Sequence, residues 1–242
     1  MASVCLRPIC REDLPFVADV AAQAMLEDEL FAYLCPHRHT HYADFRLAFL
    51  RRLKRRMVTP GCVMVVAVEQ TEPEHELNGG ARIRGYAAWE RMGTGAGAAR
   101  WHQSKKGSWH ALERLLLAIE DRYLALVAPD RSVDLPKLAH YKQASAVDCF
   151  PFDTYPELWY LDSLAVDPGF QRRGIGRQLV EWGLQQGRQE QVAVGLEASI
   201  KGTSLYERVG FRAVNSTELM PGLAITAMLW QDPLGLEDDS QG

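Results

Sequence analysis

The sequence predicts an α/β (α+β) fold, a mixed and twisted β-sheet of about six to seven strands with helices on its faces. Short apolar runs alternate with amphipathic helical patterns in the order β-α-β-α-β along the C-terminal part of the chain. The composition is also typical of a globular protein, with 47% hydrophobic and 24% charged residues among 242. A chain of this length buries a sizeable core without disulfides or metals.

The N-terminal part begins with a short strand and two helices. Apolar residues recur at helical spacing from Leu14 to Met25 and again, every fourth residue, from Phe45 to Met57. The pair Cys35-Pro36 separates the two helical patterns, and Pro60-Gly61 ends the second. The expected strands here are 4–9, 63–68 and 86–89, and the last two are joined by a long hairpin loop over 71–84.

Residues 92–156 are predicted to be a partly helical insertion that covers one side of the core. It opens with a glycine-rich run, 93–97, which we interpret as a flexible loop. A leucine-rich helix is expected over 109–127, and its apolar residues from Leu112 to Leu126 favour core packing over a surface for a partner. Four prolines then indicate an irregular stretch (Pro129, Pro136, Pro151 and Pro156).

The C-terminal part alternates strands and helices. The expected strands are 159–166, 192–198, 211–214 and 223–230, and the expected helices are 174–188 and 203–209. Residues 1–231 therefore form a single predicted domain, with 92–156 inserted into it. Residues 232–242 are acidic and are predicted to be a flexible tail.

Charge and cysteine content exclude several classes of partner. The formal net charge of −4 gives no overall attraction to nucleic acid or to anionic lipid. No stretch approaches the roughly 20 apolar residues of a membrane span. The five cysteines are odd in number and scattered, which favours reduced thiols packed as small hydrophobes. We expect a cytoplasmic protein with no nucleic-acid or membrane partner, either a monomer or a homodimer.

The residues from Leu164 to Gly176 carry the clearest chemical signal. They run from a strand through Asp167-Pro168-Gly169 into Gln171-Arg172-Arg173-Gly174-Ile175-Gly176 at the start of a helix. The first N–H groups of a helix are unpaired and its dipole is positive there, so the segment is suited to hold a diphosphate. Glycines let an anion approach the backbone closely. A third glycine and a Gly-Lys-Ser/Thr sequence are both missing, which disfavours a dinucleotide fingerprint and a P-loop.

Two ordered blocks of the sequence resemble one known family. The segment from Tyr160 to Gly176 resembles the acetyl-CoA signature of the GNAT superfamily of N-acyltransferases, and Leu205-Tyr206-Glu207-Arg208-Val209-Gly210-Phe211 resembles its second recurrent block. The order of strands and helices from Val4 to Trp230 is also similar to the GNAT fold. The resemblance implies an N-acetyltransferase that uses acetyl-CoA and needs no metal.

The resemblance also implies a set of acetyl-CoA-binding residues. The diphosphate would lie on the backbone from Arg172 to Arg177, and the pantetheine arm would pair with the strand holding Leu164, where that strand separates from the one holding Leu196. Ser199 stands where many relatives have an asparagine that bonds this arm. The implied residues are Leu164, Ala165, Val166, Gln171, Arg172, Arg173, Gly174, Ile175, Gly176, Arg177 and Ser199.

Two kinds of catalytic residue are expected. Tyr206 matches the family's tyrosine, whose hydroxyl protonates the departing thiolate. A base must accept the proton of the acceptor ammonium, and the candidates are Asp162, Glu197 and Glu90. Strand periodicity places Asp162 on the same face as Leu164 and Val166, so we prefer Asp162. A structural role as a hydrogen-bond acceptor remains the alternative for both Asp162 and Glu197.

A histidine run and a basic run each allow two competing interpretations, one functional and one structural. His37, His39 and His41 would share one face of a strand and could bind zinc, but a solvated loop between helices is favoured. The family resemblance implies that this connection borders the acceptor pocket, so the histidines could instead help to recognise the substrate. The run 51–56 resembles a nucleic-acid patch, but its position on an amphipathic helix favours a solvated basic face.

The predicted function is therefore direct transfer of an acetyl group from acetyl-CoA to a primary amine. A small-molecule amine is the first choice because the insertion and the long hairpin loop could wall a pocket. A peptide or protein amine is the second. A regulatory module that binds CoA without catalysing transfer is the alternative from another class.

Overall fold

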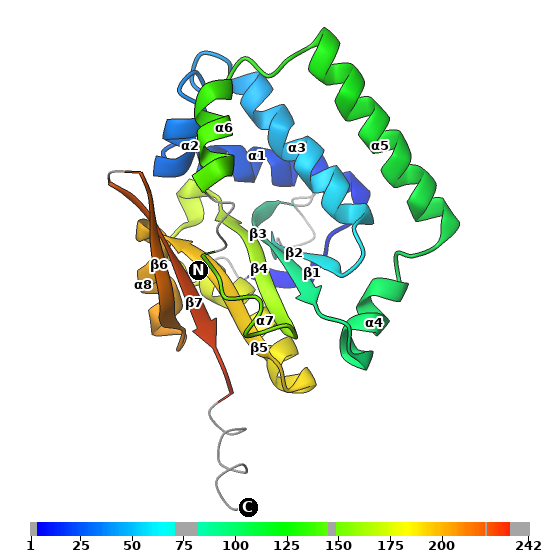
Figure 1. Cartoon of the computed structure of the whole chain (residues 1–242), viewed down its shortest axis with the longest axis vertical. Coiled ribbons are helices and arrows are strands. Elements are labelled where there is room, and N and C mark those ends of the chain that lie inside the picture. Colours follow the sequence, from blue (N-terminus) through cyan, green and yellow to red (C-terminus); the bar gives the residue numbers. More distant parts are fainter. Residues whose placement is uncertain (1–3, 71–81, 145–148, 221, 233–242) are drawn as a thin grey trace, which may run out of the picture.

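The structure is a computed structural model, and it describes residues 4–70, 82–144, 149–220 and 222–232. Most of the expected loop 71–84 and nearly all of the expected tail 232–242 lie outside the described residues. Seven strands form one sheet in the order β1-β2-β3-β4-β5-β7-β6 (Figure 1). The prediction of a mixed sheet flanked by helices is confirmed, because β4 and β5 pair in parallel and every other neighbouring pair is antiparallel.

The elements have the following bounds. The strands are β1 (Val4–Pro8), β2 (Cys62–Glu69), β3 (Ile83–Met92), β4 (Leu158–Val166), β5 (Ala193–Ser199), β6 (Arg212–Met220) and β7 (Leu223–Trp230). The helices are α1 (Leu14–Ala24), α2 (Glu29–Leu34), α3 (Tyr42–Val58), α4 (Ala96–Gln103), α5 (Ser108–Val127), α6 (Leu135–Ala144), α7 (Ile175–Glu190) and α8 (Ile200–Arg208).

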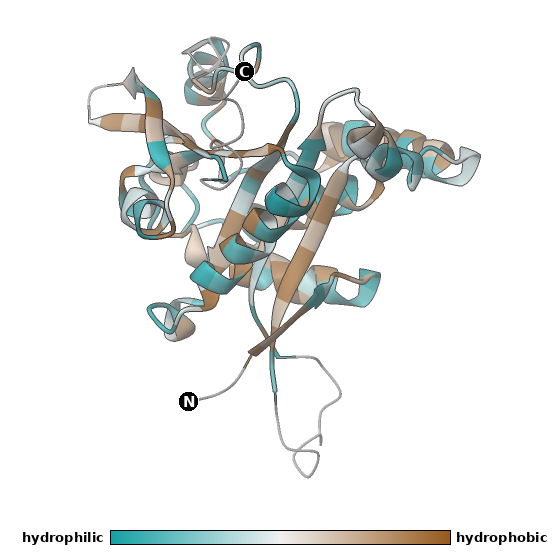
Figure 2. Ribbon diagram, turned by 90° about the horizontal axis from the view of Figure 1, so that it is seen from below, coloured by the Kyte–Doolittle hydropathy of each residue, from teal (hydrophilic) through white to brown (hydrophobic). Residues whose placement is uncertain are grey.

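Apolar side chains alternate along the central strands and form a large core on each face of the sheet, and a third, smaller cluster surrounds Phe150. On one face α1 and α3 pack on residues such as Met64, Val66 and Tyr86. On the other face α7 packs on Trp89 and Trp159. The central strands are predominantly hydrophobic in Figure 2, as expected for strands that are covered on both faces.

Helix α7 lies unusually close to the sheet because it carries a glycine where it crosses β3. A Cβ at Gly183 would lie 2.2 Å from the Trp89 ring, so any larger residue would force α7 and the strand apart. The Trp182 ring lies 6.2 Å from Trp89 and 5.8 Å from Trp159, and Trp101 lies 5.0 Å from Trp159. Four tryptophans therefore form one connected aromatic cluster beneath the β4–β5 pair.

The inserted region is more regular than predicted. The glycine-rich run 93–97, interpreted as a flexible loop, instead leads directly into α4, so that prediction is wrong. The backbone N–H groups of Thr94 and Gly95 each donate a hydrogen bond of 2.6 Å to the Glu157 carboxylate. A carboxylate of the chain itself thus holds the backbone just before this helix. Helix α6 also lies within the stretch expected to be irregular.

Several other boundaries differ from the sequence-based expectation. The region before the histidine run contains a separate helix, α2, which begins where the Asp28 side chain accepts hydrogen bonds from the N–H groups of Leu30 and Phe31. Strand β6 continues to Met220 because its whole length pairs with β7. Alternation of polar and apolar residues is weak in this segment, so the sequence pattern did not predict the longer strand.

The leucine-rich helix α5 does not pack in a core. None of its residues is buried within the part of the chain that the structure describes, and its apolar residues lie on the surface. The prediction that this stretch is core is therefore wrong. Although α5 is long, none of the described helices is both long and apolar enough to cross a membrane.

The five cysteines are free thiols, but they do not all pack as hydrophobes. Cys35, Cys62 and Cys149 are buried, whereas Cys5 and Cys10 are exposed on and just after β1. The expectation of small hydrophobes is confirmed for the buried three and is wrong for the exposed two.

Asp13 joins the first strand to the first helix through charge-assisted hydrogen bonds. Arg7 of β1 donates two, at 2.6 and 2.8 Å, and the Cys10 N–H donates a third at 2.8 Å. Burial opposes ionisation, but these bonds lower the pKa of Asp13 from 3.8 to about 2. The ionised group thus stabilises the fold above the unfolded pKa, and this contribution is lost as the pH falls through the folded pKa.

We expect Asp13→Asn to lower the free energy of unfolding at neutral pH by about 2 kcal/mol, because each pKa unit corresponds to about 1.4 kcal/mol. Urea unfolding at neutral pH and near the folded pKa measures the effect. The difference between the variant and the wild type should vanish at the lower pH. A difference that stays equal at both values would contradict this role for the Asp13 charge.

Candidate functional site

Strands β4 and β5 pair over only half of the length of β4. Their register runs from Leu158 opposite Ala193 to Leu161 opposite Leu196, and it ends there. Strand β4 continues to Val166 and β5 to Ser199, so the two strands separate beyond these last partners. The expected separation of the strands holding Leu164 and Leu196 is therefore confirmed. The result is a sheet edge inside the molecule that is open to another extended chain.

The backbone groups that β4 presents at this opening can be assigned from their neighbours. The Asp167 N–H donates to the Arg84 carbonyl, so residue 167 faces β3. Alternate residues of a strand direct their N–H and C=O groups to opposite edges, so Leu164 and Val166 face the opening and Ala165 faces β3. The Gln171 side-chain amide, which donates to the Val166 carbonyl at 3.2 Å, supports this assignment.

A β-bulge at Asp162 changes which side chains share a face of β4. Leu161 lies opposite Trp89 and Ser163 opposite Ala88, so Asp162 is the extra residue. Leu161, Leu164 and Val166 consequently pack on the α7 face, whereas Asp162 points to the other face and forms an ion pair with Arg56 of α3. The prediction that Asp162 shares a face with Leu164 and Val166 is wrong, because strict alternation ends at the bulge.

The turn between β4 and α7, residues 167–174, has the backbone of an anion site, and we call it the anion turn. Arg172 and Gly174 both adopt left-handed conformations, with φ of 58° and 84°, and α7 begins at Ile175. Residues 171–174 are exposed, as is Arg177, whereas Ile175 is buried and anchors the helix. Alternating right- and left-handed residues point successive N–H groups into one concavity, and the helix dipole adds positive potential. A diphosphate fits this turn.

The glycine at the start of α7 is required by its backbone conformation. A Cβ at Gly174 would meet no atom within 4 Å, but the left-handed conformation would strain any larger residue. Gly176 lies two residues further along, where a Cβ would meet Leu205 of α8 at 3.4 Å and Val166 at 3.7 Å. The start of α7 therefore packs closely between β4 and α8.

The arginines of this turn differ in how they are held. The Arg173 guanidinium lies 4.7 Å from the centre of the Phe170 ring, and Arg84 lies 3.8 Å from the same ring. Arg84 is also paired with Asp167 at 3.1 Å, which ties it to the turn. Arg177 pairs with Glu181 on the exposed side of α7. Carboxylates therefore balance the charges of Arg84 and Arg177, and Arg173 is the predicted arginine positioned by stacking.

Tyr206 and Ser199 both lie near Gly202 in the first turn of α8. Ser199 ends β5 and begins α8, and a Cβ on Gly202 would lie 3.5 Å from the Ser199 Oγ and 3.2 Å from the Tyr206 ring. Tyr206 is buried at 8% exposure and its ring packs against Phe211. Burial raises the pKa of Tyr206, so its hydroxyl holds its proton at neutral pH. Tyr206 thus carries a protonated hydroxyl in α8, the helix that follows β5.

Carboxylates gather on the face of the sheet opposite α7. Asp162 pairs with Arg56, and the Glu197 Oε1 accepts a hydrogen bond of 3.2 Å from the Phe150 N–H. Burial, followed by the charge of Asp162, raises the pKa of Glu90. Because its pKa is raised toward neutrality, Glu90 is the candidate whose environment best suits a general base. We call Glu90, Asp162 and Glu197 the carboxylate cluster.

The basic run 51–56 contributes to this site, which the sequence pattern did not indicate. The Arg56 side chain is only 11% exposed because it pairs with Asp162. Lys54 and Arg55 pair with Glu120 and Asp121 of α5. The expectation of a solvated basic face is therefore wrong for Arg56, whereas Lys54 and Arg55 remain 37% and 53% exposed. A signal could have been found in the spacing, since Arg56 comes three residues after the buried Leu53 and so lies on the same side of the helix.

The histidine run lies in a turn between α2 and α3 and not in a strand. The His39 Nε2 lies 3.6 Å from a Glu27 carboxylate oxygen. Among residues 4–70, 82–144, 149–220 and 222–232, no group of three His, Cys, Asp or Glu side chains could hold a metal ion. The structure thus gives these histidines no shared ligand position.

Two hollows of the described surface lie away from the strand opening. One, of about 280 Å³, lies between α3 and the C-terminal end of α5. The other, of about 490 Å³, is lined by Arg91, Glu157 and Glu190. These three side chains already form ion pairs with one another, with Arg91 to Glu190 at 2.7 Å and to Glu157 at 2.9 Å. The strand opening therefore remains the best candidate site.

Comparison with known proteins agrees with this geometry. The family model described as acetyltransferase (GNAT) domain matches residues 151–231. These residues, about a third of the chain, match the domain shared by GNAT acetyltransferases. The match includes β4, the anion turn, α7, β5 and α8, which are the elements that build the opening.

Similar proteins extend the likeness beyond the matched region. An acetyltransferase from Stachybotrys chartarum is 25% identical over 211 residues, which are 86% of this chain and 80% of the relative. A crystal structure of histone acetyltransferase HPA2 and related acetyltransferase from Corynebacterium glutamicum has a TM-score of 0.59 at 21% identity, covering 95% of this chain and 96% of that one. A putative GNAT acetyltransferase from Desulfovibrio desulfuricans has a TM-score of 0.52 at 14% identity, covering 95% and 99%.

Proposed function

We propose that this GNAT acetyltransferase takes acetyl-CoA as its donor and a small primary amine as its acceptor. The observation that carries the proposal is the continuity between the open edge of β4 and the exposed anion turn that follows it in the chain. A donor with an extended amide arm and a diphosphate matches both features together. The arm would pair with Leu164 and Val166, and the diphosphate would lie on the amides from Arg172 to Arg177.

The reaction needs two proton transfers, and different residues around the opening carry out each of them. The amine nitrogen forms a bond to the acyl carbon as the bond between that carbon and sulfur breaks. The carboxylate cluster accepts the proton of the acceptor ammonium, and Tyr206 gives its proton to the departing thiolate. The three carboxylates also attract the cationic form of the acceptor to the site.

The insertion supports a small acceptor. Burial, followed by the nearby Glu197 carboxylate, raises the pKa of Tyr141, so this α6 residue lies close to the carboxylate cluster. Helix α6 packs on α2 and carries Tyr141 to the acceptor side. A wall at this position limits the room for an extended peptide. An acceptor on a peptide or protein is the second candidate.

Thermal unfolding with and without acetyl-CoA, followed by thiol release over a panel of amines, tests the proposal. A ligand at 100 times its dissociation constant stabilises by about 2.7 kcal/mol, and each kcal/mol raises the Tm by about 2 to 4 °C for a chain of this size. S-acetylpantetheine, which lacks the diphosphate, is the matched control. It should give a much smaller shift.

The outcomes separate the alternatives. A shift with thiol release from small amines supports the proposal, and release only with peptides favours the second candidate. A shift without release from any amine would favour a CoA-binding module. The donor assignment fails if saturating acetyl-CoA leaves the Tm unchanged.

A further inference from the structure

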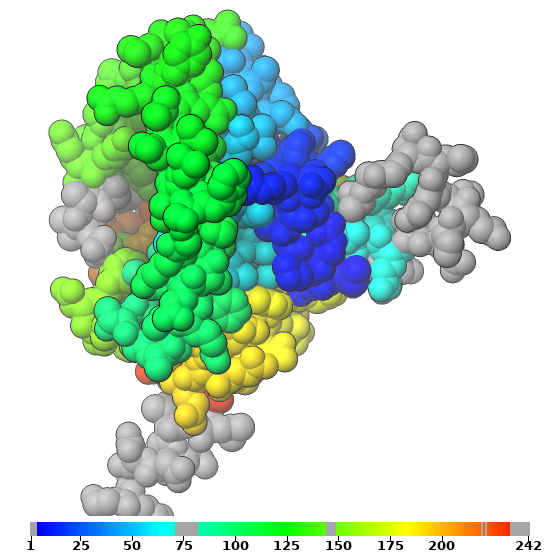
Figure 3. Space-filling model, turned by 90° about the vertical axis from the view of Figure 1, so that its right-hand side faces the viewer, coloured from blue at the N-terminus to red at the C-terminus, as the bar shows by residue number. Residues whose placement is uncertain are grey.

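In helix α5 the apolar side chains face solvent and the polar side faces the protein, the reverse of the usual arrangement in a surface helix. Its large apolar side chains face away from the body, and their exposure reaches 71% for Trp109 and 84% for Leu126. The exposed set also includes Leu112, Leu115, Leu116, Ile119, Tyr123 and Val127. Figure 3 shows α5, in green, lying along the outside of α3. Exposed apolar patches of this kind mark interaction sites.

Ion pairs fix the rotation of α5, so the apolar side cannot simply turn inward. Glu113 pairs with Arg11 at 2.5 Å, Glu120 with Lys54 at 3.2 Å, and Asp121 with Arg55 at 2.6 Å. Arg114 donates hydrogen bonds to the carbonyls of Val58 and Lys105 at 2.9 and 3.0 Å. The polar side of the helix is thus the side that contacts the rest of the chain.

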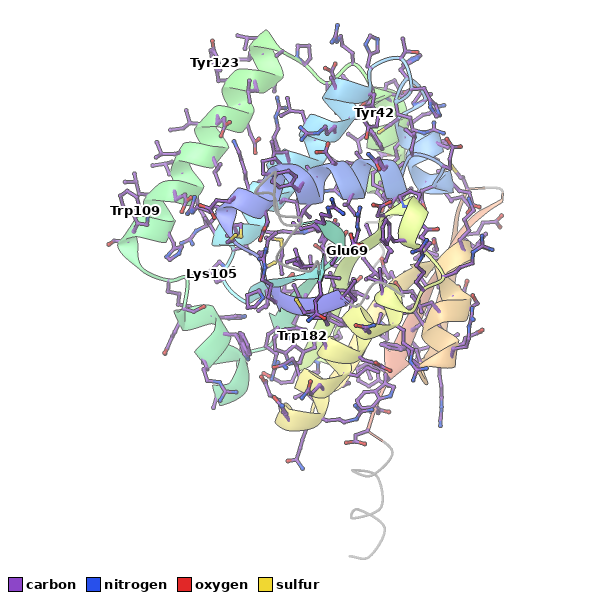
Figure 4. The ribbon with its side chains drawn as sticks, turned by 180° about the vertical axis from the view of Figure 1, so that it is seen from behind. Tyr42, Glu69, Lys105, Trp109, Tyr123 and Trp182 are labelled. Carbon is purple, nitrogen blue, oxygen red and sulfur yellow. The ribbon has the colours of Figure 1, made fainter. Side chains whose placement is uncertain are left out.

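The outward residues have the spacing of a coiled-coil seam. We define the α5 seam as Trp109, Leu112, Leu116, Ile119, Tyr123 and Leu126, in which steps of three and four residues alternate throughout. This spacing keeps one apolar stripe facing a second helix over several turns. Trp109 and Tyr123 lie toward the two ends of the stripe, on the outer side of α5 (Figure 4).

The rest of this chain offers little to cover the seam. The residues outside the described ranges hold few large apolar side chains, chiefly Leu77, Val147, Leu234 and Leu236. A second α5 supplies the same spacing and the same length, about 30 Å for 20 residues. The eight exposed apolar side chains present on the order of 800 Å², which is what each partner of a standard interface buries.

We propose that α5 is the interface of a homodimer, in which the two α5 seams pack against each other about a two-fold axis. Such an interface is self-complementary, because each seam provides the apolar stripe that the other requires. A lipid surface is a poorer occupant, because the chain carries a net charge of −4 and would be repelled by anionic headgroups. The interface lies apart from the acyl-transfer site.

Sedimentation equilibrium over a concentration series tests the dimer with a matched pair of variants. Leu116→Glu combined with Ile119→Glu places charges in the middle of the seam, whereas Ala118→Glu places a charge at an exposed position on the same helix outside the seam. We expect dimers for the wild type and for A118E, and monomers for the seam variant. Circular dichroism and thiol release should show that the seam variant remains folded and active.

Cysteine cross-linking provides a second readout in a Cys5→Ser, Cys10→Ser background, since these two thiols are exposed. Leu116→Cys alone cross-links if the helices are parallel, and mixed Leu116→Cys and Ile119→Cys chains cross-link if they are antiparallel. Either product supports the proposal. A monomeric wild type, a seam variant that stays dimeric, or flotation of the wild type with phosphatidylcholine vesicles would overturn it.

Discussion

Tyr206→Phe is expected to lower kcat by about 10²-fold or more while leaving the affinity for acetyl-CoA nearly unchanged, since general acid catalysis contributes about 10² to 10⁴. The substitution removes the hydroxyl that protonates the thiolate but keeps the ring that packs against Phe211. Burial raises the pKa of Tyr206, so the proton is available across the neutral range. Steady-state thiol release and equilibrium titration with acetyl-CoA measure the two quantities separately.

The exposed Tyr123→Phe serves as the matched control, because it removes a tyrosine hydroxyl from α5, far along the chain from the opening. Its kcat should equal that of the wild type. If Tyr206→Phe retains full activity, the thiolate takes its proton from another donor, and the assignment of Tyr206 fails.

Glu90→Gln is expected to lower kcat/KM by about 10²-fold and to remove the acidic limb of the pH profile, because general base catalysis contributes about 10² to 10⁴. In the wild type the rate should rise with pH as Glu90 loses its proton through its raised pKa. An acid whose pKa is raised on folding stabilises the fold below its unfolded pKa, and that stability is lost as the pH rises through the folded pKa. Glu90→Gln should therefore be no less stable than the wild type at neutral pH.

The Asp162→Asn variant tests whether Glu90 or Asp162 is the general base. After burial, the charge of Asp162 is the next cause that raises the pKa of Glu90, and the charge of Arg56 lowers that pKa. Removing the Asp162 charge frees Arg56 and should therefore move the acidic limb to lower pH without abolishing it. If Asp162→Asn loses the limb and Glu90→Gln keeps it, Asp162 is the base, as strand periodicity first indicated.

Much of the fold could be predicted from local patterns in the sequence. The central strands are apolar and β-branched, and the helices α1, α3 and α7 show helical periodicity, so the order of these elements follows from the chain alone. The anion turn was predicted because its glycines and arginines follow a strand directly. Short or weakly patterned elements such as α2 and β6 were missed because capping by Asp28 and pairing with β7 determine them.

The geometry of the candidate site was harder to predict, because it depends on contacts between distant segments. The extra residue at Asp162 shifts the side chains before it to the opposite face of β4 from that predicted by strict alternation. Nothing in the residues around it marks a bulge. Arg56 was assigned to a solvated helix face because only the folded chain brings α3 to β4. Helix α5 was assigned to the core because its leucine spacing is the same for an internal and an external partner.

The tryptophan cluster beneath the β4–β5 pair has an optical consequence. Trp89, Trp101, Trp159 and Trp182 are four of the six tryptophans, and neighbouring rings within the cluster are 5.0 to 6.2 Å apart. Excitation energy passes readily between indoles at such separations, so much of the intrinsic fluorescence of the protein originates from one small region. Because Trp182 belongs to α7 and Trp159 to β4, that emission reports on the contact between the helix that begins at the anion turn and the strand that precedes it.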